Sequence, residues 1–206
     1  MNPLFSIVIP TKDRYQYLIP LIDKLMRWHS NDFEVVIQDN SQDNLQGISI
    51  KKKYLNDNRL KYFHVKEHLN VVENSILAID NSLGKYICYI GDDDGIIEHA
   101  VDIVKWMDKN GIDSLNCNHG AFCWGDFRIK NRSKKASLAG MLLYKKSTGS
   151  FKFMDPQKLL LDLLQNGALV MNGITKVYHG IIRRDLLDKV KNVTGSYFPG
   201  PDPDMT

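Results

Sequence analysis

The chain has 206 residues, of which 43% are hydrophobic and 25% are charged, and its formal net charge is +3. This length fits one domain with a substantial core and argues against two independent domains. The composition is that of an ordinary globular protein, and the net charge is too small to indicate nucleic acid as a partner.

The first half of the chain alternates between strand-like and helix-like patterns. Short apolar runs rich in β-branched residues predict strands at residues 5–9, 33–37, 60–65, 86–90 and 114–117. Apolar residues at helical spacing predict helices at 18–26, 48–55, 72–83 and 98–110. Gly84 and Gly111 suit the positions after two of these helices. The alternation predicts an α/β sandwich with right-handed crossovers and a mostly parallel central sheet.

The pattern weakens after about residue 120. Asp155 followed by Pro156 is typical of a helix start, and a strand at 177–182 and a short helix at 183–190 are predicted beyond it. Basic residues crowd the stretch from Arg128 to Lys135. This stretch is either an ordinary surface loop or a contact with phosphates or an anionic membrane surface.

Cysteine usage and hydropathy bear on the compartment. Cys88, Cys117 and Cys123 show no metal-ligand spacing, and we expect free thiols in a reducing cytoplasm. The first residues lack the basic and long apolar segments of a signal peptide, and no segment is long and apolar enough to cross a bilayer. We therefore expect a cytoplasmic protein, with peripheral contact at the inner face of a membrane as the open alternative.

Three consecutive carboxylates, Asp92, Asp93 and Asp94, follow the predicted strand at 86–90. Open α/β sheets bind ligands at the carboxyl ends of their strands. Like charges this close together are unfavourable unless a cation offsets them. Oxygen ligands suit Mg²⁺ or Mn²⁺, and Mg²⁺ takes one or two protein carboxylates and completes its shell with water and substrate phosphates. The alternative is a solvated acidic turn that caps the next helix.

Four segments in this order resemble the inverting family 2 glycosyltransferases of the GT-A fold, a group of nucleotide-diphospho-sugar transferases. They are SIVIPTKDR at 6–14, VVIQDNSQD at 35–43, NVVENSILAI at 70–79 and GKYICYIGDDDG at 84–95. The resemblance runs from Phe5 to about Val104 and is thinner beyond. Each segment is weak alone, and their order and spacing make the signal specific.

The resemblance implies a nucleotide pocket for a nucleoside-diphosphate sugar, with a UDP-sugar as the expected donor. The residues implied to bind the nucleotide-sugar are Pro10, Thr11, Arg14, Asp39, Asn74 and Asp92. Asp39 would accept a hydrogen bond from the base, since an ionised carboxylate is an acceptor only. An Asx turn with Asn40 is the alternative for Asp39, and a capping or solvent-facing role is the alternative for Asn74.

The acidic triplet corresponds to the DXD-type metal site of the family. Aligned on the common Asp-X-Asp-Asp form, Gly91 replaces the first aspartate and Asp93 takes the metal-ligand position. Spacing alone would instead pair Asp92 with Asp94. We favour Asp93 as the direct ligand of Mn²⁺ or Mg²⁺, with Asp92 near the ribose or sugar and Asp94 in support.

The family's catalytic base is an Asp or Glu well after the metal site. Asp204 is favoured for that role, Asp202 is the close alternative, and a proline-rich terminal turn with solvated acids is the structural alternative. His179 lies where the family places residues near the acceptor, and a structural histidine is its alternative.

The resemblance implies a metal-dependent, inverting transferase of hexosyl type that acts on a hydroxyl of a glycan or lipid-linked acceptor, as in bacterial surface polysaccharide synthesis. Residues 1–117 would form the nucleotide-sugar half and 118–206 the acceptor half of a single domain. Family members usually continue past the base, so both a complete and a C-terminally truncated domain stay open.

Three other functions are considered. A non-catalytic nucleotide-sugar-binding domain would share the pocket and lack the reaction. A sugar nucleotidyltransferase should carry a Gly-rich basic loop after the first strand, which residues 10–14 do not provide. A phosphoacceptor signalling domain should carry an acidic pair after that strand, where the chain has Asp13 alone.

Overall fold

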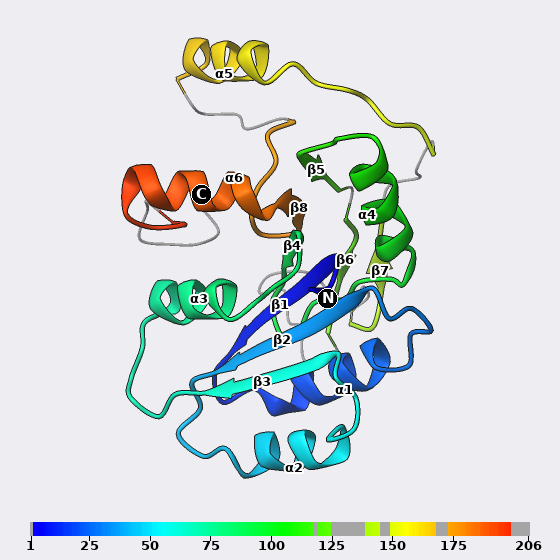
Figure 1. Ribbon diagram of the computed structural model, residues 1–206, viewed down its shortest axis with the longest axis vertical. Coiled ribbons are helices and arrows are strands. Elements are labelled where there is room, and N and C mark those ends of the chain that lie inside the picture. The colour runs from blue at the N-terminus through cyan, green and yellow to red at the C-terminus, as the bar shows by residue number, and fades with distance from the viewer. Residues whose placement is uncertain (1, 118, 125–138, 145–148, 168–172, 199–206) are drawn as a thin grey trace, which may run out of the picture. The chain divides into compact units, whose positions relative to one another are not determined.

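The computed structural model describes residues 2–117, 119–124, 139–144, 149–167 and 173–198 (Figure 1). Two compact units make up the chain. The first takes in Met1–Asn116 and Thr175–Thr206, and the second takes in Cys117–Ile174.

A six-stranded sheet forms the centre of the first unit, in the order β3-β2-β1-β4-β8-β5. The strands are β1 (Phe5–Thr11), β2 (Phe33–Asp39), β3 (Leu60–His64), β4 (Tyr86–Tyr89), β5 (Ser114–Asn116) and β8 (Gly180–Arg183). β1 pairs in parallel with β2 and β4, and β2 with β3, whereas β8 runs antiparallel to both β4 and β5. The predicted mostly parallel sheet is confirmed, and β8 is its one antiparallel member among the described strands.

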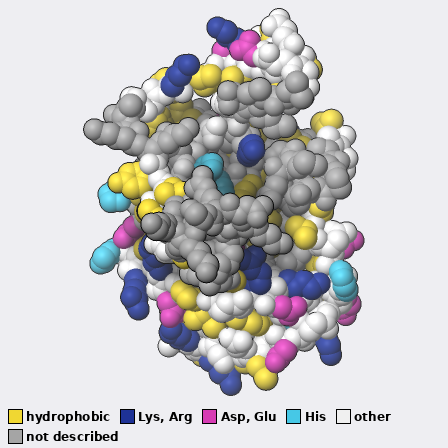
Figure 2. Space-filling view, turned by 180° about the vertical axis from the view of Figure 1, so that it is seen from behind, with side chains coloured by type: hydrophobic (Ala, Val, Ile, Leu, Met, Phe, Trp, Pro, Cys, Tyr) yellow, Lys and Arg dark blue, Asp and Glu magenta, His cyan; other side chains and the backbone are white. Residues whose placement is uncertain are grey.

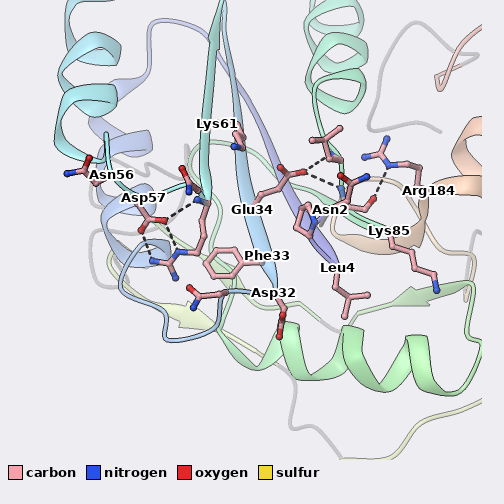
Figure 3. Close-up of a pocket in the computed structure, with 16 residues that line it drawn as sticks. Asn2, Leu4, Asp32, Phe33, Glu34, Asn56, Asp57, Lys61, Lys85 and Arg184 are labelled. Atoms are coloured by element: carbon pink, nitrogen blue, oxygen red, sulfur yellow. Dashed lines mark hydrogen bonds and ion pairs between the residues drawn. The ribbon is translucent and has the colours of Figure 1, made fainter.

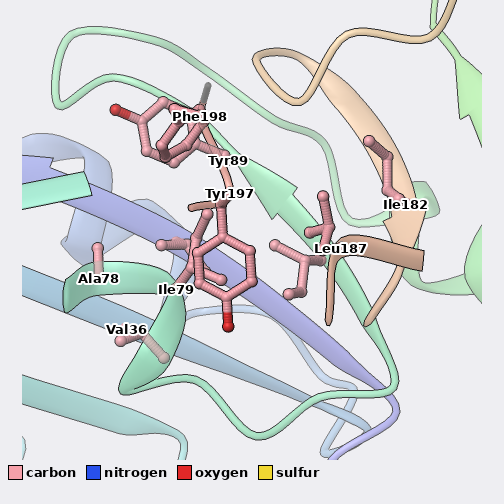
Figure 4. Close-up of a cluster of buried hydrophobic side chains, with 10 residues drawn as sticks. Val36, Ala78, Ile79, Tyr89, Ile182, Leu187, Tyr197 and Phe198 are labelled. Carbon is pink, nitrogen blue, oxygen red and sulfur yellow. The ribbon is translucent and has the colours of Figure 1, made fainter. Parts of the chain in front are cut away.

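Helices cover both faces of this sheet. They are α1 (Tyr15–Leu25), α2 (Leu45–Lys53), α3 (Val71–Asp80), α4 (His99–Lys109) and α6 (Arg184–Thr194). On one face, Ala78 and Ile79 of α3 and Leu187 of α6 join Val8 and Val36 in a buried cluster that also holds Tyr197 and Phe198 (Figure 4). Alternate strand residues point to the other face. Ile7, Ile9, Val35 and Ile37 there are fully buried as well, so the predicted α/β/α sandwich is confirmed.

The end of α3 differs from the prediction. The helix begins at a capping box formed by Asn70 and Glu73, and it ends before Asn81. Leu83 therefore lies outside the helix and is 53% exposed, so the predicted extension of this helix to residue 83 as part of its apolar face is wrong. Gly84 instead packs against β1, where a Cβ atom on it would lie 2.4 Å from Ser6 Oγ. Close approach of two backbones, rather than a helix cap, accounts for this glycine.

The outer surface of α2 mixes apolar and basic side chains. Leu45 and Ile48 are exposed, and the last turn carries three consecutive lysines. Figure 2 shows hydrophobic and basic side chains side by side at the lower end of the molecule. No helix in the described part of the chain is long and apolar enough to span a membrane.

The second unit contains the strands β6 (Ala121–Phe122) and β7 (Leu142–Leu143), which pair antiparallel, and the helix α5 (Pro156–Gln165). Asp155 caps α5 by accepting a hydrogen bond of 2.9 Å from Gln157 N, as the Asp-Pro pair predicted. Leu160, Leu161 and Leu164 of this helix are exposed. The basic stretch from Arg128 to Lys135 lies outside the described residues.

Candidate active site

The carboxyl edge of the sheet brings most of the predicted site residues together. Thr11 is the last residue of β1 and lies beside Asp39, the last residue of β2. Asp92, Asp93 and Asp94 form the turn that follows β4, which is the other neighbour of β1. Pro10 lies within β1 opposite Gln38. Segments far apart in the sequence thus meet at the edge where open α/β sheets bind ligands.

Thr11, Arg14, Asp92 and Asp93 form one network. The Thr11 hydroxyl donates to Asp92 Oδ2 at 2.6 Å, and Arg14 Nε lies 3.3 Å from Asp92 Oδ1. The Arg14 guanidinium also donates to Asp93 Oδ2. Burial raises the pKa of Asp92, which is 3% exposed, and the Thr11 hydroxyl and the Arg14 charge offset only part of that rise. Asp92 is enclosed by protein, whereas the side chain of Asp93 is 32% exposed.

Asp94 is held by the segment that leads into β8. Its Oδ2 accepts hydrogen bonds from Gly91 N at 2.7 Å and from the Tyr178 hydroxyl at 2.6 Å, and His179 Nε2 lies 2.9 Å away. Burial on its own would raise the pKa of Asp94, but these three donors outweigh it and lower that pKa. His179 adopts a left-handed φ of 64° and donates its backbone N–H to Tyr89 O. This turn delays the start of β8 to Gly180, three residues after the predicted start.

Oxygen atoms fill the space beside Gly91, where the common form of the motif has an aspartate. A Cβ atom on Gly91 would lie 3.0 Å from the Tyr178 hydroxyl and 3.1 Å from both Asp93 Oδ1 and Asp94 Oδ2. A larger residue at position 91 would displace these groups. The arrangement of Asp93 and Asp94 therefore requires a glycine there.

A hard divalent ion fits this donor set. The described residues contain no group of three acidic, His or Cys side chains that would chelate an ion without other ligands. An Mg²⁺-like ion needs only one or two carboxylates, because water and substrate phosphates supply the rest. Asp93 meets that need: it is partly exposed, and its Oδ1 accepts no hydrogen bond from the described residues.

Asp39 is fully buried and hydrogen-bonded within the chain. Its Oδ1 accepts from Ser41 N at 2.8 Å, and its Oδ2 accepts from the hydroxyls of Tyr15 and Tyr62. Burial, together with these hydrogen bonds to Asp39, raises the pKa of both tyrosines. An Asx turn, the alternative to a base-binding role for Asp39, is present and closes on Ser41 N. Sequence reasoning missed both tyrosines, because an aromatic residue in an amphipathic helix or a strand is usually a packing residue.

Asn74 reaches the same edge from α3. Its Nδ2 lies 3.4 Å from Thr11 O and 3.5 Å from Gln38 O. The residue is 7% exposed, and its Oδ1 is buried with no hydrogen-bond partner among the described residues. An acceptor left unpaired in this way is costly unless a ligand or water supplies a donor. Asn74 neither caps α3 nor faces solvent, since Asn70 is the cap.

The two candidate bases, Asp202 and Asp204, lie outside the described residues. Both remain predictions. Tyr178 was not expected from the sequence, and the only signal for it is its position next to His179.

Comparison with known proteins identifies relatives of the chain. The sequence model of Glycosyl transferase family 2 matches residues 6–184. A protein of Rickettsia felis named uncharacterized glycosyltransferase is 32% identical over 108 residues, which are 51% of this chain and 17% of that protein. The GalNAc(5)-diNAcBac-PP-undecaprenol beta-1,3-glucosyltransferase of Campylobacter jejuni is 26% identical over 113 residues, which are 53% of this chain and 36% of that protein. The matches thus span about a third or less of these curated relatives.

Solved structures show the same fold. The structure of S. aureus TarS 1-349 aligns with a TM-score of 0.60 at 20% identity, over 93% of this chain and 49% of that one. The same protein in complex with UDP gives 0.59 at 19% identity, again over 93% of this chain and 49% of that one. This likeness is one of fold and agrees with the predicted GT-A sandwich. The family model covers well over half of the chain, which therefore belongs to glycosyl transferase family 2.

Proposed function

We propose that the chain is the catalytic domain of a metal-dependent, inverting glycosyltransferase. It would move a sugar from a nucleoside-diphosphate sugar, with UDP as the expected nucleotide, to a hydroxyl of a glycan or lipid-linked acceptor. Family membership supports the reaction class, and the TarS structure that contains UDP supports the nucleotide. The observation that carries the proposal is the network of Thr11, Arg14, Asp92 and Asp93 at the carboxyl edge of the sheet.

The donor would bind across the ends of β1, β2 and β4. Arg14 is about half exposed, and its planar guanidinium suits the oxygens of a diphosphate. Asn74 Oδ1, buried and without a partner among the described residues, would accept a hydrogen bond from the ribose or the base. Asp39 would accept a hydrogen bond from an N–H of the base; because it is fully buried and already accepts three hydrogen bonds, Tyr15 or Tyr62 would have to move aside for the base to reach it.

The reaction would be a single displacement. The acceptor oxygen forms a bond to the anomeric carbon on one face of the sugar while the bond from that carbon to the diphosphate oxygen breaks on the other face. The acceptor proton passes to a carboxylate base, which we assign to Asp204, with Asp202 as the alternative. A divalent ion held by Asp93, when bound, would offset the negative charge that develops on the diphosphate. Asp92 would lie near the ribose or sugar, and Asp94 would support the turn.

We further propose that residues 1–117 bind the donor and that 118–206 contribute the acceptor side. We also propose that the protein is cytoplasmic and that the basic stretch from Arg128 to Lys135 contacts the inner face of a membrane.

Thermal unfolding tests the proposal. A ligand that binds only the folded state raises the melting temperature. Mn²⁺ together with a UDP-sugar should therefore raise it more than either does alone. The absence of any shift across UDP-, dTDP- and GDP-sugars would contradict the proposal. A donor-hydrolysis assay would then separate a transferase from a domain that binds nucleotide-sugars without catalysis.

A further inference from the structure

A cavity of about 1060 Å³ lies at the other edge of the sheet, where the parallel strands begin (Figure 3). Its lining comes from residues 2–4, 31–34, 56–59, 61 and 83–85, at or just before the starts of β1, β2, β3 and β4, and from Arg184 at the start of α6. The acidic turn of Asp92, Asp93 and Asp94 follows β4, at the opposite edge of the sheet. A strand of this length spans about 20 Å, so the cavity is separate from the candidate active site.

Glu34 on β2 gives this cavity an unsatisfied buried acceptor. Its Oε1 accepts hydrogen bonds from Ser6 Oγ and Leu83 N, both at 2.6 Å, and from Gly84 N at 3.2 Å. Glu34 is 2% exposed, and its Oε2 is buried without a hydrogen-bond partner among the described residues. Figure 3 shows the side chain between Lys61 and Arg184. A buried carboxylate oxygen is costly unless a donor reaches it.

The other charges of the lining divide into paired and unpaired groups. The paired ones are Asp57 with Arg59, Asp32 with Lys105, and Lys85 with Asp108. Lys61 and Arg184 form no ion pair with a described residue. Arg184 donates to the neutral acceptors Gly84 O at 2.9 Å and Ser82 Oγ at 2.6 Å. One carboxylate and two cations are thus left for a ligand to satisfy.

The lining carries both negative and positive charges, and this limits the kinds of ligand that can bind. An anion would suit Lys61 and Arg184, but it would be repelled by Glu34 and would give Oε2 no donor. An ammonium group would suit Glu34 but would face both cations. A hydroxyl group both donates and accepts, so one kind of group serves all three residues. The lining also includes four asparagines, whose amides likewise donate and accept: Asn2, Asn31, Asn56 and Asn58.

We propose that this cavity is a carbohydrate-binding site, in which the Glu34 side chain turns so that its covered Oε2 accepts a hydrogen bond from a sugar hydroxyl, and Lys61 donates one to another. The site lies outside the proposed transfer reaction, and it could bind a glycan whether or not the carboxyl edge is catalytic.

Amide chemical shifts of ¹⁵N-labelled protein would test this site, with glucose and N-acetylglucosamine as probes. The amides of Leu83 and Gly84 are suitable reporters, because they bind the same carboxylate. Sugar should shift these two signals and that of Lys61. UDP with Mn²⁺ should instead shift signals around Arg14 and Asp93, so failure of the transferase proposal would be seen separately.

Two variants and a control make the test decisive. Glu34→Gln keeps one acceptor oxygen and replaces the other with an amide donor, and Lys61→Met removes the charge while keeping most of the stem. Each should weaken sugar binding about tenfold, whereas Lys52→Met on the exposed surface of α2 should not change it. Lys61→Met leaves the hydrogen bonds of Glu34 intact, so the test holds even if Glu34→Gln fails to fold. The proposal is overturned if neither sugar shifts the reporters, if both variants bind like the native chain, or if only ammonium or phosphate ions produce the shifts.

Discussion

Thr11 donates its hydroxyl hydrogen to Asp92 Oδ2 at 2.6 Å, although the two residues are 81 positions apart in the chain. The bond joins the end of β1 to the turn after β4, and both residues are buried. Hydrogen bonds to charged groups contribute more to stability than those between neutral groups. This contact therefore both stabilises the fold and orients the first carboxylate of the triplet.

Replacing Thr11 with Val should separate these effects. The substitution keeps the shape of the side chain and leaves the buried Asp92 with one donor fewer. We expect the free energy of unfolding to fall by about 1–3 kcal/mol. Urea denaturation followed by circular dichroism measures this change. Thr11→Ser keeps the hydroxyl and loses only a buried methyl group, which costs about 0.8 kcal/mol, and it serves as the control. A Thr11→Val variant as stable as the native chain would show that the contact contributes nothing.

Asp93 is the most exposed carboxylate of the triplet, so it is the one most accessible to a metal ion. Asp93→Ala should lower the affinity for UDP in the presence of Mn²⁺ by about tenfold or more, because it removes the proposed ion ligand. Isothermal titration calorimetry with and without Mn²⁺ measures the difference. Asp102→Ala, on the first turn of α4, is the control. If the Asp93 variant keeps native metal-dependent binding, Asp93 is not the ligand.

Arg59 ties three parts of the first unit together, and its partner Asp57 gives a pH-dependent prediction. The Arg59 guanidinium binds both Asp57 oxygens and the backbone carbonyls of Met26, Trp28 and Ser30. The hydrogen bonds from Arg59 lower the pKa of Asp57 below its usual value of about 3.9. Because the folded-state pKa is the lower one, this carboxylate stabilises the fold above about pH 4, and the effect is lost as pH falls through the folded-state pKa.

Asp57→Asn should therefore be less stable than the native chain at neutral pH, and the gap should close in acid. Urea midpoints measured at a series of pH values would show it. A gap of constant size down to the lowest pH at which the chain stays folded would mean that the pair acts through shape rather than charge.

The sequence predicted the framework of the site better than its contacts. Apolar runs located the carboxyl ends of β1, β2 and β4 to within two residues, because burial on both faces of a sheet leaves a strong local pattern. The bond from Thr11 to Asp92 depends on β1 and β4 being neighbours, and no local pattern encodes that order. Tyr15 and Tyr62 were missed for a related reason. The spacing of apolar residues in a helix or strand shows which side chains point inward, but it does not show that a tyrosine hydroxyl contacts a carboxylate there.

Near Asp94 the prediction failed for a reason of backbone conformation. The apolar residues after Lys176 suggested a strand from residue 177, but His179 takes a left-handed conformation that its residue type does not require. Tyr178 forms an isolated bridge with Tyr89 instead of joining β8. The turn brings Tyr178 and His179 to Asp94, so the departure from the pattern falls at the candidate site itself.

Gly84 provides a final prediction with a matched control in the same segment. A Cβ atom there would lie 2.4 Å from Ser6 Oγ and 2.6 Å from Ser6 N, and backbone atoms cannot move aside as a flexible side chain can. The Gly84 N–H also donates to Ser6 Oγ at 2.7 Å, so any displacement would disturb the hydrogen bonds around Glu34.

Gly84→Ala should therefore destabilise the fold by about 1–3 kcal/mol or more. At Gly95 an added Cβ would meet nothing within 4 Å, so Gly95→Ala should be nearly neutral. Thermal unfolding of the two variants side by side measures the difference, and similar melting temperatures would show that β1 and the segment before β4 are not packed as tightly as described.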